Sequence, residues 1–359
     1  MRLEDIFNNP QADEDLRQAR NKSGRKRVTE EEHRKYVQNT FFETFSNWLR
    51  ESVYCGNPKY YSSTHLYLDR INLPWTLADI SEFTQNERHN DSNNSELGVF
   101  VSALINRVIK PKDELELVPR EGIFDDNLCI FLERGTVHIR GDVNKNVAYK
   151  NSGGSVVVHG TAHTGYGDFM SGGSLVIDFV RGGGVACVSG GTIQLGTSQP
   201  AFPEIRYDFS LNNGIAFNQS GNSKIIIKGD IPKFVFRIGQ SQEGGELIVT
   251  GTVHCKYINS NQSGGKTDIY GNVDHREVCI GHWKSNGQTI IHGDVKHSYM
   301  QQIIEREYSG YVLGSGIGYM QEGGLIEIRG NVYGGVPEFG TGDAKLIVRG
   351  KVISPFSKH

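Results

Sequence analysis

A nine-residue pattern that recurs along the C-terminal two thirds of the chain constrains the fold more than any other feature. Each copy reads G-x-h-x-h-x-G-[D/N/T]-h, where h is apolar, and the copies follow one another at intervals of about 18 to 23 residues. Complete copies begin at Gly135, Gly154, Gly245, Gly265, Gly287 and Gly324, and partial copies begin at Gly173, Gly191, Asn222 and Ala344. A period of this length is typical of solenoids.

Alternation within each copy predicts a short strand with one apolar face. The inward pairs are Val137/Ile139, Val156/Val158, Leu175/Ile177, Ile193/Leu195, Ile225/Ile227, Leu247/Val249, Ile326/Ile328 and Leu346/Val348. One copy has too little apolar surface to fold alone, whereas copies stacked about 4.8 Å apart line these residues into a continuous core. We therefore expect residues 135–359 to form a right-handed parallel β-helix, a solenoid of about ten coils.

The glycines and the residue after the second glycine fit the corners of such coils. A corner requires positive φ or a close backbone approach, which glycine permits, and the chain has 44 glycines. The Asp, Asn or Thr that follows is expected to bond neighbouring backbone amides.

Three glycine-rich stretches carry a resemblance to a known family. They run from Gly141 to Gly154, from Gly165 to Gly173 (GYGDFMSGG) and from Met320 to Gly324 (MQEGG). This rhythm resembles the GXGXG solenoid shared by the C-terminal domain of the glutamate synthase large subunit and by one of the subunits of formylmethanofuran dehydrogenase. The resemblance implies a solenoid that supports other domains and subunits, and it brings no catalytic residues.

The region before the solenoid is expected to be helical over residues 29–112. Thr29 and Glu32 form a capping box, so one amphipathic helix should run from Thr29 to about Val53. A second should run from Ser95 to Val108 and end before Pro111, with a polar loop over 84–94 between them.

Residues 113–134 alternate like strands, with Leu115/Leu117 and Leu128/Ile130/Leu132 apolar, and should cap the open end of the solenoid. Residues 97–109 and 113–132 also resemble the lead-in of uncharacterised, mainly archaeal proteins of this type.

Residues 1–28 form a basic arm that we expect to be flexible. Its cations are Arg17, Arg20, Lys22, Arg25, Lys26 and Arg27. Such an arm binds anions, and it would dock on nucleic acid, a ribonucleoprotein or an acidic protein face; the alternative is a solvated, disordered segment.

Two coils are longer than the rest and predict long loops at 198–220 and 299–321. Loops on a rigid frame often carry function, and they also serve merely to cover core or a neighbouring subunit.

The residues that come nearest to a metal motif are His275, Cys279 and His282, with His254 and Cys255 one coil away. Their spacing matches no finger or ribbon family, so we predict no metal or other cofactor and interpret them as structural.

Two rows of outward residues are expected along the stacked strands. Charged residues stand just before the second glycine at Arg140, His159, Lys228, His292, Arg329 and Arg349. An apolar row lies two residues earlier, at Val157, Val176, Ile226, Ile248, Ile290 and Ile347. A contiguous apolar strip usually marks a contact surface, so we predict a partner interface at the apolar row, although β-branched residues also favour strands when exposed.

Composition indicates where the protein is expected to reside and whether it is held together by disulfides. Net charge is only -3, apolar runs are too short for a membrane helix, and the first thirty residues lack a signal-peptide core, so a cytoplasmic location is expected. Five widely spaced cysteines without a CxxC pair do not resemble a disulfide framework.

The function that we predict is a non-enzymatic scaffold that assembles with a protein partner or with itself. The outward acids Asp178, Asp268 and Glu327 lie in separate coils, which disfavours a paired-carboxylate enzyme. Two alternatives stay open: a structural subunit of a redox or amidotransferase-type complex, and nucleic-acid binding through the arm.

Overall fold

The structure is a computed structural model, and its contacts divide the chain into two units, Met1–Asn47 and Trp48–His359. It describes residues 35–36, 39–40, 43–48, 61–70, 75–85, 94–118, 123–124, 126–181, 183–197, 214–233, 235–297, 316–334 and 342–353. The described residues of the first unit are helical, as the predicted helix from Thr29 requires. The capping box, the basic arm with its six cations and the C-terminal residues 354–359 lie outside the described residues.

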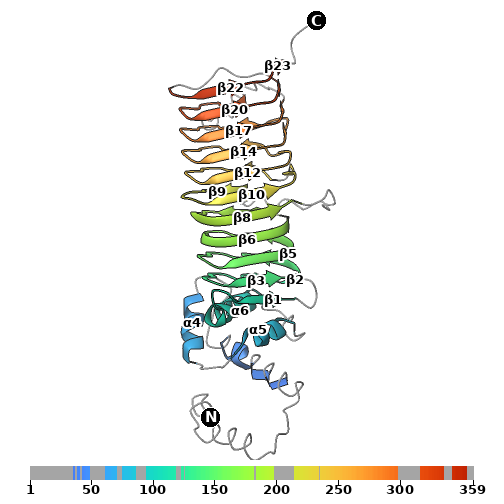
Figure 1. The fold of residues 1–359 in the computed structure, drawn as a ribbon, viewed down its shortest axis with the longest axis vertical. Helices are drawn as coiled ribbons and strands as arrows, with labels where there is room; N and C mark the ends of the chain where they lie inside the picture. Colours follow the sequence, from blue (N-terminus) through green and yellow to red (C-terminus); the bar gives the residue numbers. More distant parts are fainter. Residues whose placement is uncertain are drawn as a thin grey trace, which may run out of the picture. The chain divides into compact units, whose positions relative to one another are not determined.

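The second unit is a parallel β-solenoid, which confirms the predicted fold class (Figure 1). Within the described residues, three parallel sheets run along it, and we call them sheets A, B and C. Sheet A has thirteen strands, eleven of which stack in one unbroken order; sheet B has six and sheet C has four. The right-handed sense is the one expected for parallel crossovers.

The stacked strands of sheet A are β1 (Glu114–Leu117), β3 (Thr136–Ile139), β5 (Ser155–Thr164), β6 (Ser171–Val180), β8 (Gly190–Gly196), β10 (Lys224–Lys228), β12 (Glu246–Val249), β14 (Lys266–Ile269), β17 (Gln288–Ile291), β20 (Leu325–Ile328) and β22 (Lys345–Val348). Beside them lie β2 (Ile123–Phe124) and β4 (Asp142–Lys145). Sheet B contains β7 (Gly184–Ala186), β9 (Gly214–Phe217), β11 (Arg237–Ile238), β13 (Tyr257–Ile258), β16 (Cys279–Ile280) and β19 (Gly316–Ile317). Sheet C contains β15 (Val273–Asp274), β18 (Val295–Lys296), β21 (Val332–Tyr333) and β23 (Val352–Ile353).

The ten predicted copies of the repeat are the ten strands of sheet A from β3 to β22. Their inward side chains are buried from Val137 through Ile328, whereas Leu346 and Val348 in the last coil are half-buried. Stacking therefore supplies the core, and the C-terminal coil has described neighbours on one side only.

The two glycines of a copy serve different purposes. Gly265 has φ +71°, a left-handed conformation that other residues adopt only with strain. A Cβ on Gly271 would lie 2.2 Å from the carbonyl oxygen of Gly251 in the preceding coil, so the second glycine allows close stacking.

The residue after the second glycine links neighbouring coils, as the sequence predicts. The Asn272 side chain accepts a hydrogen bond from the backbone N–H of Asp294 at 2.8 Å. Asp294 accepts in turn from Asn331 at 2.7 Å, and Asn331 accepts from Lys351 at 3.0 Å. The result is a continuous series of side-chain links along one corner.

Another side of the solenoid is built from left-handed residues at every second position. In one coil these are Gly165, Gly167 and Phe169, with φ of 64°, 67° and 60°. The neighbouring coil places Asn146, Ala148 and Lys150 in the same conformation. Hydrogen bonds between the coils hold this backbone, among them Lys150 N–H to Asp168 O at 2.8 Å and Gly167 N–H to Val147 O at 2.9 Å.

Residues 113–134 form a first coil, which differs from the predicted cap. β1 pairs in parallel with β3 and β2 with β4. Leu128, Ile130 and Leu132 are buried in the same coil. β1 and β2 thus extend the ladder, whereas the strand predicted at residues 128–132 is not formed, because Cys129 and Phe131 adopt positive φ in a turn segment. The end of the ladder is covered by helices.

The helices of the second unit are α4 (Tyr61–Arg70), α5 (Leu77–Thr84) and α6 (Asn94–Val108). α6 matches the predicted helix within one residue, while α4 and α5 were not predicted. α5 begins with a capping box in which Thr76 and Asp79 bond each other's backbone, and it ends at Thr84, the first residue of the region expected as a polar loop. None of the described helices is long and apolar enough to cross a membrane.

Helix α6 caps the solenoid with polar side chains that bond the first coil. Ser102 Oγ donates to the Asn127 carbonyl at 2.9 Å and accepts from Ile130 N–H at 3.2 Å. Asn106 donates to the Ile130 carbonyl at 3.1 Å and accepts from Glu133 N–H at 3.3 Å. Without these side chains, the backbone carbonyl and N–H groups of the first coil that they bond would be unpaired at the edge of the ladder.

The two predicted long loops are shorter than the sequence indicates. Their C-terminal parts contain the strands β9 and β19, which extend sheet B. The alternating pattern does not reveal these strands, because each pairs with its neighbour through only two residues. The remaining residues of the two loops, 198–213 and 298–315, lie outside the described residues.

Replacing Asn106 with Ala should destabilise the protein, because it leaves the buried Ile130 carbonyl and the part-buried Glu133 N–H of the first coil without this partner. The expected loss is about 2 kcal/mol, measured as a lower midpoint of urea unfolding. Arg107→Ala, one residue further, removes only an exposed ion pair with Asp69 and should cost under about 1 kcal/mol. Equal losses in the two variants would contradict the capping role.

Candidate functional site

The outer face of sheet A carries the predicted apolar row as one aligned column. The strand register places Val157 beside Val176, Ile226 beside Ile248, and Glu327 between Ile290 and Ile347. The complete column is Glu116, His138, Val157, Val176, Gln194, Ile226, Ile248, Asp268, Ile290, Glu327 and Ile347. Six apolar side chains thus share one line with polar side chains between them.

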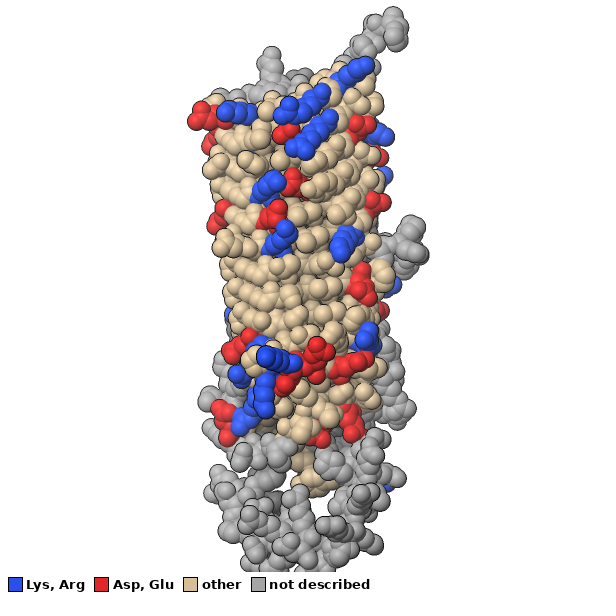
Figure 2. Space-filling model, in the orientation of Figure 1, with Lys and Arg blue, Asp and Glu red and all other residues tan. Residues whose placement is uncertain are grey.

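This face is only partly covered by its own chain. Ile290 is buried with 8% exposed, Ile347 is 38% exposed, and the other members of the apolar row are half-buried. Figure 2 shows an uncharged band on this side of the solenoid, with charged side chains above and below it. The charged side chains of the middle strands include Lys224, Glu246 and Lys266, which form ion pairs with neighbouring residues. Parallel sheets are usually covered on both faces, so the apolar row is a candidate contact surface.

The charged row lies next to the corner glycines, at the edge of the same face. Arg140 pairs with Glu116 at 2.9 Å. Arg349 and Arg329 share the Glu327 carboxylate at 2.6 and 3.2 Å, and these hydrogen bonds lower the pKa of Glu327, that from Arg349 most. Several cations of the row are therefore matched by acids of the neighbouring column, which weakens the case for a binding site for anions.

Histidines join the two columns at the N-terminal end of the face. His138 Nδ1 lies 3.4 Å from His159 Nε2, and the rings stack with centroids 5.7 Å apart. His159 Nδ1 lies 3.8 Å from the Asp178 carboxylate. The outward acids Asp268 and Glu327 are separated by β17 and therefore do not form a carboxylate pair.

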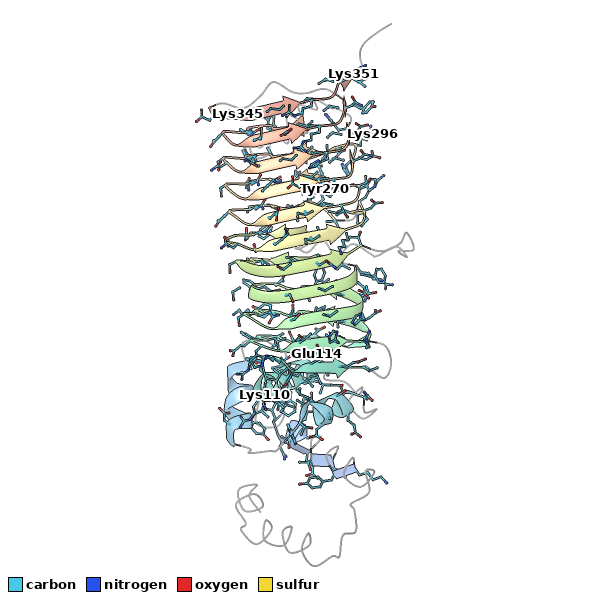
Figure 3. The ribbon with its side chains drawn as sticks, viewed as in Figure 1. Lys110, Glu114, Tyr270, Lys296, Lys345 and Lys351 are labelled. Atoms are coloured by element: carbon cyan, nitrogen blue, oxygen red, sulfur yellow. The ribbon has the colours of Figure 1, made fainter. Side chains whose placement is uncertain are left out.

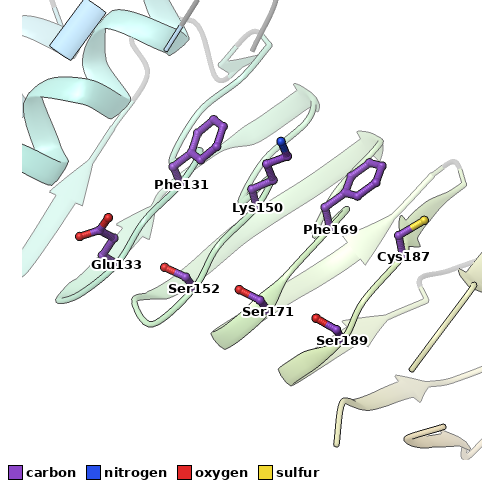
Figure 4. Close-up of a pocket in the computed structure, with 8 residues that line it drawn as sticks. All are labelled: Phe131, Glu133, Lys150, Ser152, Phe169, Ser171, Cys187 and Ser189. Atoms are coloured by element: carbon purple, nitrogen blue, oxygen red, sulfur yellow. The ribbon is translucent and has the colours of Figure 1, made fainter. Parts of the chain in front are cut away.

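A groove of about 480 Å³ runs along another side of the solenoid. Figure 4 shows its two columns of side chains, which stand two residues apart in each coil. One column holds Phe131, Lys150, Phe169 and Cys187, and the other holds Glu133, Ser152, Ser171 and Ser189. The first column consists of left-handed residues, and the second precedes the glycine pair of each repeat.

The groove offers ring faces, one ammonium group and a line of hydroxyls. Lys150 Nζ lies 5.4 Å from the Phe131 ring and 5.5 Å from the Tyr149 ring, and Phe169 is 45% exposed. Such groups stack on flat ligands and form hydrogen bonds, and Glu133 and Cys187 add a carboxylate and a thiol to the lining. The repeated Ser-Gly-Gly at 152–154, 171–173 and 189–191 is the sequence signal that would have revealed the serine column.

The metal candidates occupy separate structural positions. His282 is buried and stacks on Trp283 with ring centroids 4.1 Å apart, and Cys279 lies in β16. His275 Nδ1 accepts the Glu277 N–H at 3.0 Å. Burial raises the pKa of Cys279 and of Cys255, which disfavours the thiolate that a metal needs. Among the described residues, no group of three or more His, Cys, Asp or Glu side chains is placed to hold a metal ion.

One interior column turns from apolar to polar along the solenoid. Inter-coil hydrogen bonds align Leu132, Asn151, Met170, Val188, Gln219, Gln242, Gln262, Lys284 and Gln321. Gln262 Nε2 donates to Gln242 Oε1 at 2.9 Å, and Gln242 Nε2 donates to Gln219 Oε1 at 3.3 Å. Amide side chains that bond one another in this way satisfy their polar groups inside the core.

Lys284 places an amine in this interior column, where it is fully buried. Its Nζ donates to Gln262 Oε1 and, at 3.3 Å, to Thr289 Oγ1. The described part of the chain gives it no carboxylate, and burial lowers the pKa of the ammonium from 10.5 to about 7. No sequence signal marks this position, because nothing in the repeat distinguishes an inward lysine from an outward one.

Comparisons with protein-family models, with curated proteins and with solved structures found no match to this chain. The functional assignment therefore rests on the surfaces described above.

The free energy of unfolding should rise with pH between about 7 and 10 because of Lys284. In that window the unfolded chain holds a proton on this amine that the folded chain lacks, so each pH unit should add roughly 1 kcal/mol. Lys284→Met should be more stable than the parent at pH 7 and should lose this part of the pH dependence, as measured by urea unfolding across the pH range.

The exposed Lys296 provides the matched control, because Lys296→Met should leave the pH dependence unchanged. Lower stability of Lys284→Met at pH 7 would contradict the interpretation, since it would mean that the buried amine is a net stabiliser.

Proposed function

We propose that this protein is a non-enzymatic scaffold that assembles with protein through the outer face of sheet A. The observation that carries this proposal is the apolar row, whose members lie in register along the outer face of the solenoid. Contiguous apolar surface of this kind is removed from water when a partner covers it, and the burial stabilises the complex.

The chemistry of the described surfaces supports the same proposal. The groove and the sheet A face hold hydroxyls, rings and several matched ion pairs, and among the described contacts no base is hydrogen-bonded to a nucleophile on either surface. The proposal places the scaffold in the cytoplasm, since the described cysteines Cys129, Cys187, Cys255 and Cys279 are free thiols.

The experiment described below can also reveal either of two other functions. A structural subunit of an enzyme complex would use the same face, and the partner would then be a catalytic chain in fixed stoichiometry. Nucleic-acid binding would depend on residues 17–27 and would be sensitive to salt.

The test compares native assemblies purified from the source cells. Val176→Asp combined with Ile248→Asp places two carboxylates on the apolar row, and burying them against a partner is unfavourable. We expect the assembly to fall at least about tenfold by native mass measurement, while the thermal transition of the chain stays near that of the parent.

Phe236→Asp is the matched control. Phe236 is an exposed apolar residue, 41% accessible, beside β11 in sheet B, so the same change in charge falls on another side. This variant should keep the assembly. An assembly that survives in the Val176→Asp/Ile248→Asp variant would refute the proposed function.

A further inference from the structure

The groove between the ring column and the serine column offers the groups that bind a linear sugar chain. We propose that it binds a neutral, equatorially 1,4-linked oligosaccharide that lies along the solenoid axis with one sugar unit on each coil. This inference goes beyond the proposed function, because the groove lies on a different side of the solenoid from the outer face of sheet A and its occupant is a carbohydrate.

Three exposed hydroxyls line one side of the groove. Ser152, Ser171 and Ser189 occupy equivalent positions in three successive coils, and all three side chains are exposed. Within the described part of the chain, these hydroxyls form no hydrogen bond. A serine hydroxyl both donates and accepts, so the column can bond the hydroxyls of a ligand at every coil.

The surface between this serine column and sheet A consists of backbone. Each serine is followed by two glycines, and the next residue again carries a hydroxyl, at Ser155, Ser174 and Thr192. A Cβ on Gly172 would lie 2.2 Å from the carbonyl oxygen of Ser152 in the preceding coil, so the stacking of the coils excludes a side chain here. A ligand can therefore approach the backbone closely between two columns of hydroxyls.

Two phenylalanine rings stand opposite the serines, at every second coil (Figure 4). Phe131 and Phe169 are two coils apart, roughly 10 Å along the axis, and Phe169 is 45% exposed. Other rings hold them in place: Phe131 stacks on Tyr61 with centroids 4.4 Å apart, and Tyr149 and Phe169 form a T-shaped pair at 5.4 Å. Fixed rings suit sugars, because the negative face of a ring attracts the polarised C–H groups of a pyranose.

The spacing of the coils indicates the kind of sugar chain. Coils follow one another about 4.8 Å apart, which is close to the length of one sugar unit in an extended, equatorially linked glycan. Alternate units of such a chain turn opposite faces to the same side, so every second unit would present the same face to Phe131 and to Phe169. An axially linked glycan curves into a helix and loses this register.

The charges of the groove favour a neutral chain. Among the described lining residues, only Lys150 and Glu133 are charged, and their charges are opposite. Single-stranded nucleic acid would need a positively charged groove along its phosphates. An extended peptide would need free backbone groups, whereas the backbone here is bonded from coil to coil, as in Ser171 N–H to Asn151 O at 2.9 Å.

Calorimetric titration of the purified chain with cellohexaose, which is equatorially linked, tests the proposal. An open groove of this kind should bind it with a Kd on the order of 10⁻⁴ M. Affinity should rise with chain length up to about four sugars, one for each coil from Phe131 to Cys187, and then level off. Maltohexaose, which is axially linked, should bind at least about tenfold more weakly.

Phe169→Ala removes an exposed ring from the groove and should weaken the binding of cellohexaose roughly tenfold. Phe179→Ala is the matched control, because Phe179 is 43% exposed in β6 of the same coil but does not line the groove. Phe169→Trp keeps a ring and should retain the affinity. The thermal transitions of all three variants should stay near that of the parent, since both side chains are exposed.

Three results would overturn the inference. The first is no binding of cellohexaose at about 10 mM, and the second is an equal loss of affinity in Phe169→Ala and Phe179→Ala. The third is binding of maltohexaose or of an oligothymidylate in preference to cellohexaose, with a loss in Phe169→Ala, which would assign the groove to a helical glycan or to single-stranded nucleic acid.

Failure of this inference is distinct from failure of the proposed function. Val176→Asp/Ile248→Asp, which tests the sheet A face, should bind cellohexaose as the parent does. Phe169→Ala should in turn keep the native assembly. Each surface therefore has a variant that leaves the other unchanged.

Discussion

The parallel hydrogen bonding of each coil onto the next is the constraint on which the rest of this molecule depends. It fixes the spacing between coils, so every side chain lies directly above its equivalent in the coil below. Inward positions become the core, and corners become stacks of glycine in which a Cβ on Gly271 would approach the backbone of Gly251 within 2.2 Å. The same constraint turns a repeated choice of residue into a surface feature. One outward valine has little consequence, whereas the apolar row forms a continuous line.

Much of this architecture could be predicted from the sequence because the core needs only the period and the alternation. Val137, Ile139 and their equivalents were recognised because both properties are visible in a single strand. Leu115 and Leu117 lie in a strand as predicted, but Leu128, Ile130 and Leu132 lie in a turn segment with positive φ at Cys129 and Phe131. This first coil joins the ladder, and α6 provides the cap through Ser102 and Asn106. That role depends on contacts between distant residues, which no local pattern records. The short α5 was missed although Thr76 and Asp79 form a capping box, since eight residues are too few to show a clear helical period.

One candidate surface, the apolar row, could be predicted from the sequence, and the other, the groove, could not. The apolar row was found because alternation gives both faces of a strand at once, and register then aligned its members. The groove was not found, because its columns follow a left-handed backbone in which Phe169 and Lys150 adopt positive φ, and helix or strand periodicity does not describe such a segment. Lys284 was missed for a related reason. Its environment, a line of glutamine amides, is assembled from four separate coils.

The coils also behave as interchangeable units of length. A coil touches only the coils before and after it, so duplicating one in the middle would lengthen the ladder without disturbing the helical cap or the last strand. A chain built on this plan can therefore change its length by whole coils while keeping the same helical cap and the same last strand.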